Sequence, residues 1–100
     1  YRAPMIIVLI SHIKKHNRVP DIEQVLSTAA AAQNILLAIH ALNYGAIWRT
    51  GIFALNDKIG KYFNLNKNQK ILGYIYVGKP TTKFKKIPEI NVEKYISRWK

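Results

Sequence analysis

The chain changes from a helical to an extended pattern within the stretch "AAAAQNILLAIHALNYGAIWRTG", residues 29–51. Apolar residues recur at three- and four-residue steps through its first part and back to Ile22, which predicts an amphipathic helix beginning at Asp21. Asp21 and Gln24 have the spacing of a capping box, and Gly45 is placed to be the left-handed residue at the helix end. The sequence therefore predicts a helix of about 22 residues, roughly 33 Å long.

The four alanines at residues 29–32 leave the middle of this helix without side-chain bulk. Such a surface allows another backbone or a flat ligand to come close. Four alanines also simply favour the helical state where two elements cross tightly, because alanine has the highest helix propensity. At the level of the sequence, both interpretations stay open.

The short apolar run that follows the helix, "GAIWR", predicts a strand over residues 45–49. Arg49 is unusual in such a run, because burying an unpaired guanidinium costs several kcal/mol. An anionic or carbonyl-rich group is therefore expected to meet Arg49. Trp48 would either pack near such a ligand or fill the core, and Thr50 offers a hydroxyl group beside it.

Two further strands flank this segment. The run "APMIIVLIS" (residues 3–11), preceded by Arg2, is nearly continuously apolar and β-branched, which predicts a strand buried on both faces. The run "KILGYIYVGKP" (residues 70–80) predicts a third strand that ends at Gly78 and Pro80.

The rest of the chain predicts a short helix and an extended arm. The run "ALNDKIGKYF" (residues 54–63) places four apolar side chains on one helical face: Leu55, Ile59, Tyr62 and Phe63. Residues 81–100 contain lysines and two further breaks at Pro88 and Asn91, so we expect them to be extended. Their last part has amphipathic spacing, carried by Val92, Tyr95, Ile96 and Trp99.

The bulk composition limits the class of protein. A chain of 100 residues that is 49% hydrophobic is one domain or part of one. It begins at Tyr1 and shows no signal-peptide pattern, so we expect a piece of a longer chain. Residues 26–42 are judged too polar and too short to span a bilayer. The absence of cysteine excludes disulfides and thiolate sites. We expect a cytoplasmic protein without a membrane partner.

The formal charge of +11 first suggests nucleic acid or an anionic surface as a partner. Lysine outnumbers arginine by twelve to four, however, and isoleucine and asparagine are also abundant, which favours a compositional origin of the charge. Tyr74, Tyr76 and Trp99 lie in apolar runs, as core residues do, and no known binding motif occurs. A nucleic-acid-binding module is therefore the weaker alternative.

No group of residues in the sequence predicts catalysis or metal binding by the protein itself. The five acidic residues are scattered, and neither a nucleophile elbow nor a glycine-rich phosphate loop occurs. His12 and His16 lie four apart in a polar loop, but a metal pair would need a helix and a third ligand, and Lys14 and Lys15 would repel the cation. An enzyme built on this sequence would rely on a cofactor for the difficult step.

The order of "RAPMIIVLI", "AAAAQNILLAIHALNYG", "GAIWRTG", a short helix and "KILGYIYVGKP" resembles the C-terminal half of the FMN-dependent NAD(P)H nitroreductase family. The resemblance is greatest to a small subgroup with tryptophan, arginine and serine or threonine before a glycine. It implies an α+β fold, an antiparallel sheet flanked by helices, of which this chain is an incomplete C-terminal portion. Residues 1–80 would belong to that domain, and residues 81–100 would form an arm that crosses to a partner subunit.

The resemblance also implies a function and a site. The family works as a homodimer with FMN at the interface, reduced by NAD(P)H and reoxidised by nitroaromatics or quinones in ping-pong hydride transfer. By motif match, Trp48, Arg49 and Thr50 are the flavin-contacting positions. The helix end matches a region attributed to nicotinamide nucleotide contacts, which here is Ala38, Ile39, His40, Ala41, Leu42 and Asn43. The arm would bring a basic residue to the FMN phosphate, with Lys83 as the candidate and Lys85 and Lys86 next, unless these lysines form a solvated tail.

One departure from the family pattern qualifies these expectations. Family members begin with a helix whose arginine-arginine-serine motif grips the FMN phosphate and ribityl chain, and nothing similar precedes Tyr1. The missing half would also cover the sheet, so we expect exposed apolar faces on the first strand and the long helix unless another chain covers them. We expect this piece alone to bind FMN poorly or not at all. A non-catalytic dimerising remnant of the fold remains an alternative.

Overall fold

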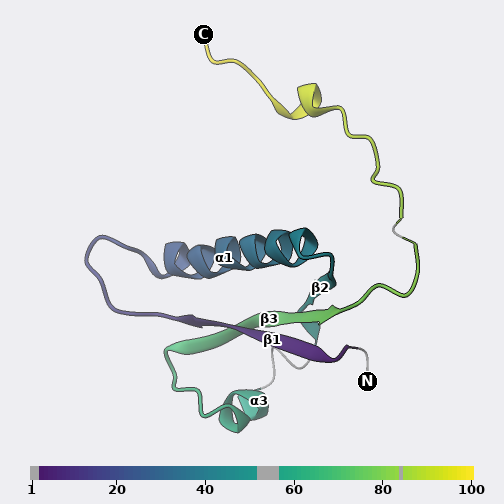
Figure 1. The fold of residues 1–100 in the computed structure, drawn as a ribbon. Coiled ribbons are helices and arrows are strands. Elements are labelled where there is room, and N and C mark those ends of the chain that lie inside the picture. The colour runs from purple at the N-terminus through teal and green to yellow at the C-terminus, as the bar shows by residue number, and fades with distance from the viewer. Residues whose placement is uncertain (1–2, 52–56, 84) are drawn as a thin grey trace.

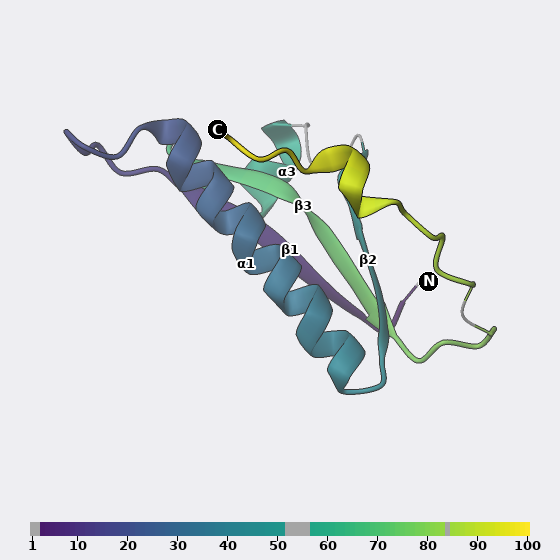
Figure 2. The ribbon, with the colours of Figure 1, turned by 90° about the horizontal axis from the view of Figure 1, so that it is seen from above.

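The computed structural model describes residues 3–51, 57–83 and 85–100. A three-stranded antiparallel sheet carries one long helix, α1, on one face (Figures 1 and 2). The strand order is β1-β3-β2, so β3 is central and pairs with both neighbours. The elements in chain order are β1 (Met5–His12), α1 (Asp21–Ala41), β2 (Gly45–Arg49), α3 (Asp57–Tyr62), β3 (Gln69–Gly78) and the 3-10 helix η1 (Val92–Tyr95). This arrangement confirms the predicted α+β class and all three predicted strands.

The core lies between α1 and the sheet. It is formed by Leu9, Ala32, Ile39, Ile75 and Val77, with Trp48 among the half-buried residues packed against it. Ala32 and Ile75 are fully buried. The small side chain of Ala32 lets the helix axis come close to the sheet at this point. The alanine run therefore serves, at Ala32, a tight crossing of two elements rather than an open ligand surface.

Both predicted helix caps of α1 are wrong. Pro20 occupies the N-cap position, and no side chain caps the first turn. Gln24 instead accepts a hydrogen bond from the Lys14 N–H at 2.9 Å, and its amide donates to the Lys14 carbonyl oxygen at 2.8 Å and the Val19 carbonyl oxygen at 3.1 Å. At the other end, Asn43 has the left-handed backbone with φ of 65°, while Gly45 already belongs to β2.

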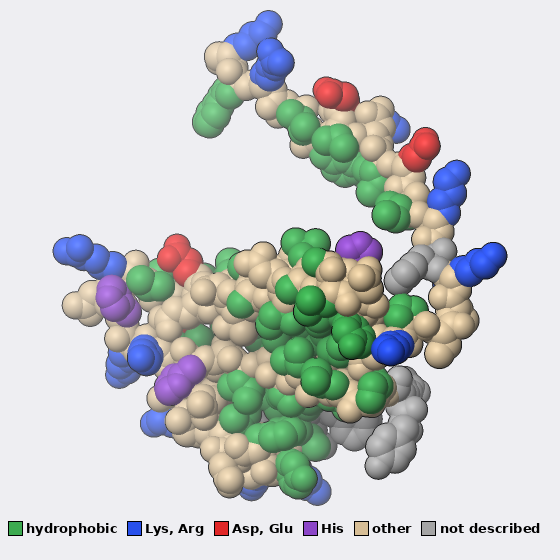
Figure 3. All heavy atoms as spheres, viewed as in Figure 1, with side chains coloured by type: hydrophobic (Ala, Val, Ile, Leu, Met, Phe, Trp, Pro, Cys, Tyr) green, Lys and Arg blue, Asp and Glu red, His purple; other side chains and the backbone are tan. Residues whose placement is uncertain are grey.

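The prediction that β1 is buried on both faces is wrong for this chain. Leu9 and Ser11 are buried on the side of α1, whereas Ile6 on the opposite face is 50% exposed. The outer side of α1 is also apolar and exposed at Ile22 and Leu26. Hydrophobic side chains accordingly gather on the surface around α1 and the strands beneath it (Figure 3). The expectation of exposed apolar faces on the first strand and the long helix is confirmed.

The short helix and the arm follow their predictions in part. Within the described residues, α3 ends at Tyr62, one residue before the predicted end at Phe63. Leu55, like Arg2 before the first strand, lies outside the described residues. The arm leaves β3 and runs away from the sheet (Figure 1). Its large apolar side chains are exposed: Ile87, Ile90, Val92, Tyr95, Ile96 and Trp99. Whether the arm crosses to a partner subunit stays a prediction.

By length and composition alone, α1 is long and apolar enough to cross a membrane. The expectation that this helix is too short and too polar to do so therefore does not hold. The core helix of a folded domain passes the same test, and α1 buries Ala32 and Ile39 against the sheet. Ala32 and Ile39 are the buried residues of α1, and its other apolar side chains stay wholly or partly exposed in this chain.

Candidate functional site

The predicted flavin-contacting residues lie at the end of β2, beside the middle of β3. Trp48 pairs with Ile75, and Arg49 pairs with Tyr74. Successive residues of a strand point to opposite faces. Trp48 therefore lies on the face covered by α1, and Arg49 lies on the opposite face, which α1 leaves uncovered.

Trp48 is a core residue in this structure. Its side chain is half-buried and packs against the core cluster between α1 and the sheet. Its Nε1–H donates a long hydrogen bond of 3.4 Å to the carbonyl oxygen of Leu72. The structure shows that Trp48 helps to fill the core, while its contact with a flavin stays a prediction.

Arg49 and Thr50 are both exposed. The expectation that Arg49 sits in a buried strand and needs a partner there is wrong, because the guanidinium points away from the α1-covered core. Within the part of the chain that the structure describes, Arg49 makes no ion pair or side-chain hydrogen bond. Its charge and five N–H donors, together with the Thr50 hydroxyl, are available to a group from outside the chain.

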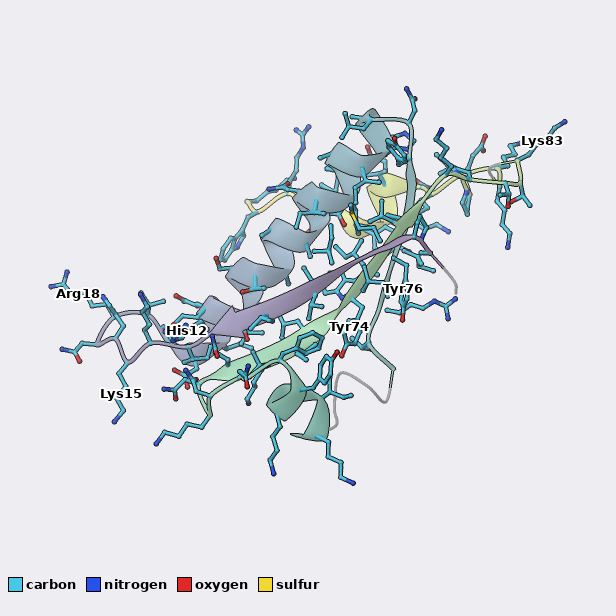
Figure 4. All side chains as sticks on the ribbon, turned by 60° about the horizontal axis from the view of Figure 1, so that its bottom comes forward. His12, Lys15, Arg18, Tyr74, Tyr76 and Lys83 are labelled. Carbon is cyan, nitrogen blue, oxygen red and sulfur yellow. The ribbon has the colours of Figure 1, made fainter. Side chains whose placement is uncertain are left out.

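The face that carries Arg49 also carries two tyrosines of β3. Tyr76 pairs with Ile6 on one side and Ile47 on the other, so these three side chains form a row across the sheet. Tyr74 is next along β3 on this face, and both tyrosines lie on the side of the sheet away from α1 (Figure 4). Burial raises the pKa of the Tyr74 hydroxyl, and the neighbouring Tyr76 raises it further. Among the described strand residues, this face is thus largely apolar and aromatic, and Arg49 adds a cation at the end of β2.

The residues predicted for nicotinamide nucleotide contacts form the last turn of α1 and its exit. Only two of them, Ile39 and Leu42, line a groove of about 710 Å³ between the end of α1 and the sheet. The groove is lined by Pro4, Met5, Ile7, Ile39, Leu42, Tyr44, Val77, Gly78 and Lys79. Ala38, His40, Ala41 and Asn43 are exposed outside that lining. Arg49 and Thr50 do not line this groove either, so among the described residues the two predicted sites do not share it.

The arm lysines proposed to meet the flavin phosphate follow β3. Lys83, Lys85 and Lys86 are exposed. Lys83 lies in the arm, apart from Tyr74 and Tyr76 (Figure 4). The predicted contact of these lysines with a flavin phosphate, made across a subunit interface, stays a prediction.

The polar loop between β1 and α1 forms a separate basic end of the molecule. His12, Lys15 and Arg18 lie there, at the far side of the sheet from Lys83 (Figure 4). His16 Nδ1 accepts a hydrogen bond of 3.0 Å from the Arg18 N–H, so the ring is used within the loop. Among the described residues, no group of three or more potential ligands could hold a metal ion.

Sequence reasoning missed Gly73. Leu9 pairs with Gly73 and Ile10 with Ile71, so Leu72 is an extra residue in β3 and forms a bulge. Gly73 has a φ of 148°, a region that favours glycine. A glycine inside a strand is the sequence signal for such a bulge, and "KILGYIYVGKP" contains one.

Comparisons with known proteins agree on one family. The model of the nitroreductase family matches residues 1–79. YdjA of Escherichia coli K12, whose name marks it as a candidate NAD(P)H nitroreductase, is 31% identical over 83 residues, which are 83% of this chain and 45% of YdjA. The chain therefore spans about half the length of the curated relatives it matches.

Solved structures show the same fold. A nitroreductase-like family protein from Bacillus cereus superposes with a TM-score of 0.76 at 18% identity, over 94% of this chain and 50% of that protein. A candidate nitroreductase from Desulfovibrio desulfuricans, solved in complex with FMN, has a TM-score of 0.71 at 22% identity, over 93% of this chain and 54% of that protein. At these identities, the likeness establishes the fold alone.

Proposed function

Since this chain belongs to the nitroreductase family, we propose that it is the C-terminal portion of an FMN-dependent oxidoreductase. The protein would take a hydride from NAD(P)H and pass it to nitroaromatics or quinones in a ping-pong cycle, with FMN held between two subunits. YdjA supports the donor, because its name specifies NAD(P)H. The Desulfovibrio relative supports the cofactor, because it was solved with FMN. We further propose a cytoplasmic location.

The observation that carries this proposal is the exposed Arg49–Thr50 end of β2. A flavin offers carbonyl oxygens and unprotonated ring nitrogens, and a phosphate on its ribityl chain, and all of these accept hydrogen bonds. Arg49 and Thr50 supply donors, which fits that acceptor set. When bound, FMN supplies the hydride-accepting ring, and the protein supplies binding and electrostatics.

The three residues at the end of β2 would have different roles in flavin binding. Arg49 would hold the acceptor edge of the flavin and place a positive charge where the reduced ring becomes anionic, which stabilises the reduced state. Thr50 would add a hydroxyl donor beside it. Trp48 would not touch the reacting ring but would fix the strand end from the core side, through its packing under α1 and its bond to Leu72.

The surface of the chain supports a dimer as the working unit. The chain exposes 9472 Å², whereas a compact folded protein of this mass exposes about 5,800 Å². Exposed apolar side chains of the arm, β1 and α1 contribute to this excess, and either a second copy or the rest of the domain would cover them. A second copy that covers the groove and receives the arm would remove much of this area, and it would bring the partner subunit's copies of the arm lysines near the flavin phosphate.

Titration with FMN, followed residue by residue, tests the proposal. Amide chemical shifts of the isotope-labelled chain are recorded at increasing FMN concentrations, so that even millimolar affinity is detected. We expect saturable shifts at residues 48–51, and we expect Arg49→Gln to weaken the affinity about 10- to 100-fold, as for loss of a charge-assisted hydrogen bond. Arg18→Gln removes the same charge from the distant loop and serves as the control.

Three outcomes separate the candidate functions. Shifts at residues 48–51, with a flavin absorbance band that NAD(P)H bleaches, would support a working site. Shifts without bleaching would support a flavin-binding portion whose activity needs the rest of the domain. If saturating FMN moves no amide between residues 48 and 51, this portion does not form the flavin site by itself, and the activity would need the rest of the domain; a longer protein that also binds no FMN would be a non-catalytic dimerising remnant.

A further inference from the structure

In the middle of β3, Gly73 lies directly beneath the side chain of Trp48. An added β-carbon at Gly73 would lie 2.8 Å from Trp48 Cδ1 and 2.9 Å from the Arg49 carbonyl oxygen, and closer still to Trp48 Nε1. These separations are shorter than van der Waals contact allows. Only glycine leaves room for the indole and for the end of β2 at the same time.

The backbone of β3 is shaped for this contact. Leu72 is the extra residue of the bulge, opposite the register shift between Leu9 and Ile10. Its carbonyl oxygen accepts the hydrogen bond from Trp48 Nε1. A bulge increases the local twist and redirects the strand. Here it turns the Leu72 carbonyl towards the indole and places a φ that favours glycine at the next residue.

The contact is located where β2 ends. The ladder between β2 and β3 stops at the pair Arg49 and Tyr74, one residue from Gly73. The Arg49 carbonyl oxygen itself lies within reach of a β-carbon at Gly73. The packing of Trp48 on Gly73 therefore determines where the backbone of Arg49 leaves the sheet. It also determines the direction in which the Arg49 and Thr50 donors point.

We propose that Gly73, through the bulge at Leu72, is a positioning residue for the Trp48–Thr50 segment. It acts through Trp48 and touches no ligand itself. The inference rests on the proposed function for its consequence, which is loss of flavin affinity. Its geometric content, that Gly73 fixes the orientation of residues 48–50, does not need a flavin.

The test uses the whole chain and two glycine variants. Gly73→Ala adds a methyl group against Trp48. Gly60→Ala in α3 makes the same chemical change where the nearest atoms, of Leu65, are 4.0 Å away. Trp99→Phe is introduced into all versions, because Trp99 is fully exposed and its removal leaves Trp48 as the single tryptophan. Trp48 emission, the amide shifts of Arg49 and Thr50, and FMN affinity are then measured.

For Gly73→Ala we expect Trp48 emission to move to longer wavelength as the indole is displaced from the core. We expect shifts at the Arg49 and Thr50 amides, and an FMN affinity about tenfold weaker. Gly60→Ala should leave all three unchanged. Adding Trp48→Leu to Gly73→Ala makes room for the methyl group, so the perturbation caused by the alanine should shrink in that background.

A second variant covers the case in which Gly73→Ala does not fold. Trp48→Phe keeps Gly73 but removes the donor to Leu72 and part of the ring that rests on the glycine. It should shift the Arg49 and Thr50 amides and weaken FMN binding in the same direction. The inference is overturned if folded Gly73→Ala, or folded Trp48→Phe in its place, leaves the Arg49 and Thr50 amides at their wild-type positions. If the unsubstituted chain binds no FMN, the proposed flavin site is not formed by this portion alone, while the emission and amide measurements still decide the role of Gly73.

Discussion

The indole of Trp48 on β2 occupies the space that a β-carbon at residue 73 of β3 would need, so the Trp48 ring packs directly on the backbone of Gly73. The hydrogen bond from Trp48 Nε1 to the Leu72 carbonyl closes this contact on one side. Trp48 also packs against the core beneath α1. One contact thus joins the core of the domain to the strand end that carries Arg49.

Replacing Gly73 by alanine should destabilise the chain clearly. A methyl group forced into a filled space costs about 1–3 kcal/mol of unfolding free energy, and the φ of Gly73 adds strain for any L side chain. Urea unfolding followed by far-UV circular dichroism measures the loss. Gly60→Ala should instead raise the stability by about 0.5–1 kcal/mol, because Gly60 lies in a helix with room for the methyl group. Equal stabilities of the two variants would contradict the packing described here.

The sequence predicted the strand that carries residues 48 and 49, but it did not predict which side of the sheet each side chain faces. The pattern of residues 29–51 is local, and it correctly predicted the long helix followed by a short strand. In a strand, Trp48 and Arg49 must point to opposite faces, but the sequence does not say which face α1 will cover. That choice depends on the long-range pairing of Trp48 with Ile75, so the exposure of Arg49 could not be foreseen.

Gln24 shows the same limit at the start of α1. Its spacing from Asp21 fits a capping box, which is a local motif. In the folded chain the side chain reaches Lys14 and Val19, because the preceding loop folds back over the helix start. Gly73 was missed for a related reason: a glycine in a strand suggests a bulge, but only the neighbouring strand reveals what rests on it.

Gln24→Ala should loosen the loop before α1 without unfolding the domain. The substitution removes three hydrogen bonds that hold residues 14–19, each with a net worth of about 0.5–1.5 kcal/mol and less at an exposed site. Limited trypsin digestion should cut several-fold faster at Lys14, Lys15 and Arg18. Gln33→Ala is the control, since Gln33 is a glutamine of α1 that is exposed and lies away from the loop. If both variants are cut at the same rate, Gln24 does not order the loop.

Tyr74 should make the stability fall in alkaline solution. Its pKa is raised in the folded state by burial and by Tyr76, whereas in the unfolded chain it is about 10. The unfolded state therefore loses its proton first, so this contribution is fully present below pH 10 and is lost as the pH rises through the folded pKa. Tyr74→Phe should flatten the decline of unfolding free energy above pH 10. Tyr95→Phe, at an exposed tyrosine of the arm, should not change that slope. Identical slopes in both variants would show that Tyr74 is not responsible.

Removing the arm should change the association of the chain but not the folding of its body. The apolar side chains of the arm are exposed in the single chain, with Ile87 at 85% and Tyr95 at 80%. They contribute little to the body, so a chain ending at Pro80 should keep its circular dichroism and lose little stability. If the arm holds a second copy, sedimentation should show a dimer for residues 1–100 and a monomer for residues 1–80.

A milder variant, Tyr95→Ser with Trp99→Ser, keeps the charge and length of the arm and should weaken the dimer as well. A dimer that survives both changes would place the subunit contact on the apolar faces of β1 and α1 instead, where Ile6→Lys is the substitution that should then abolish it.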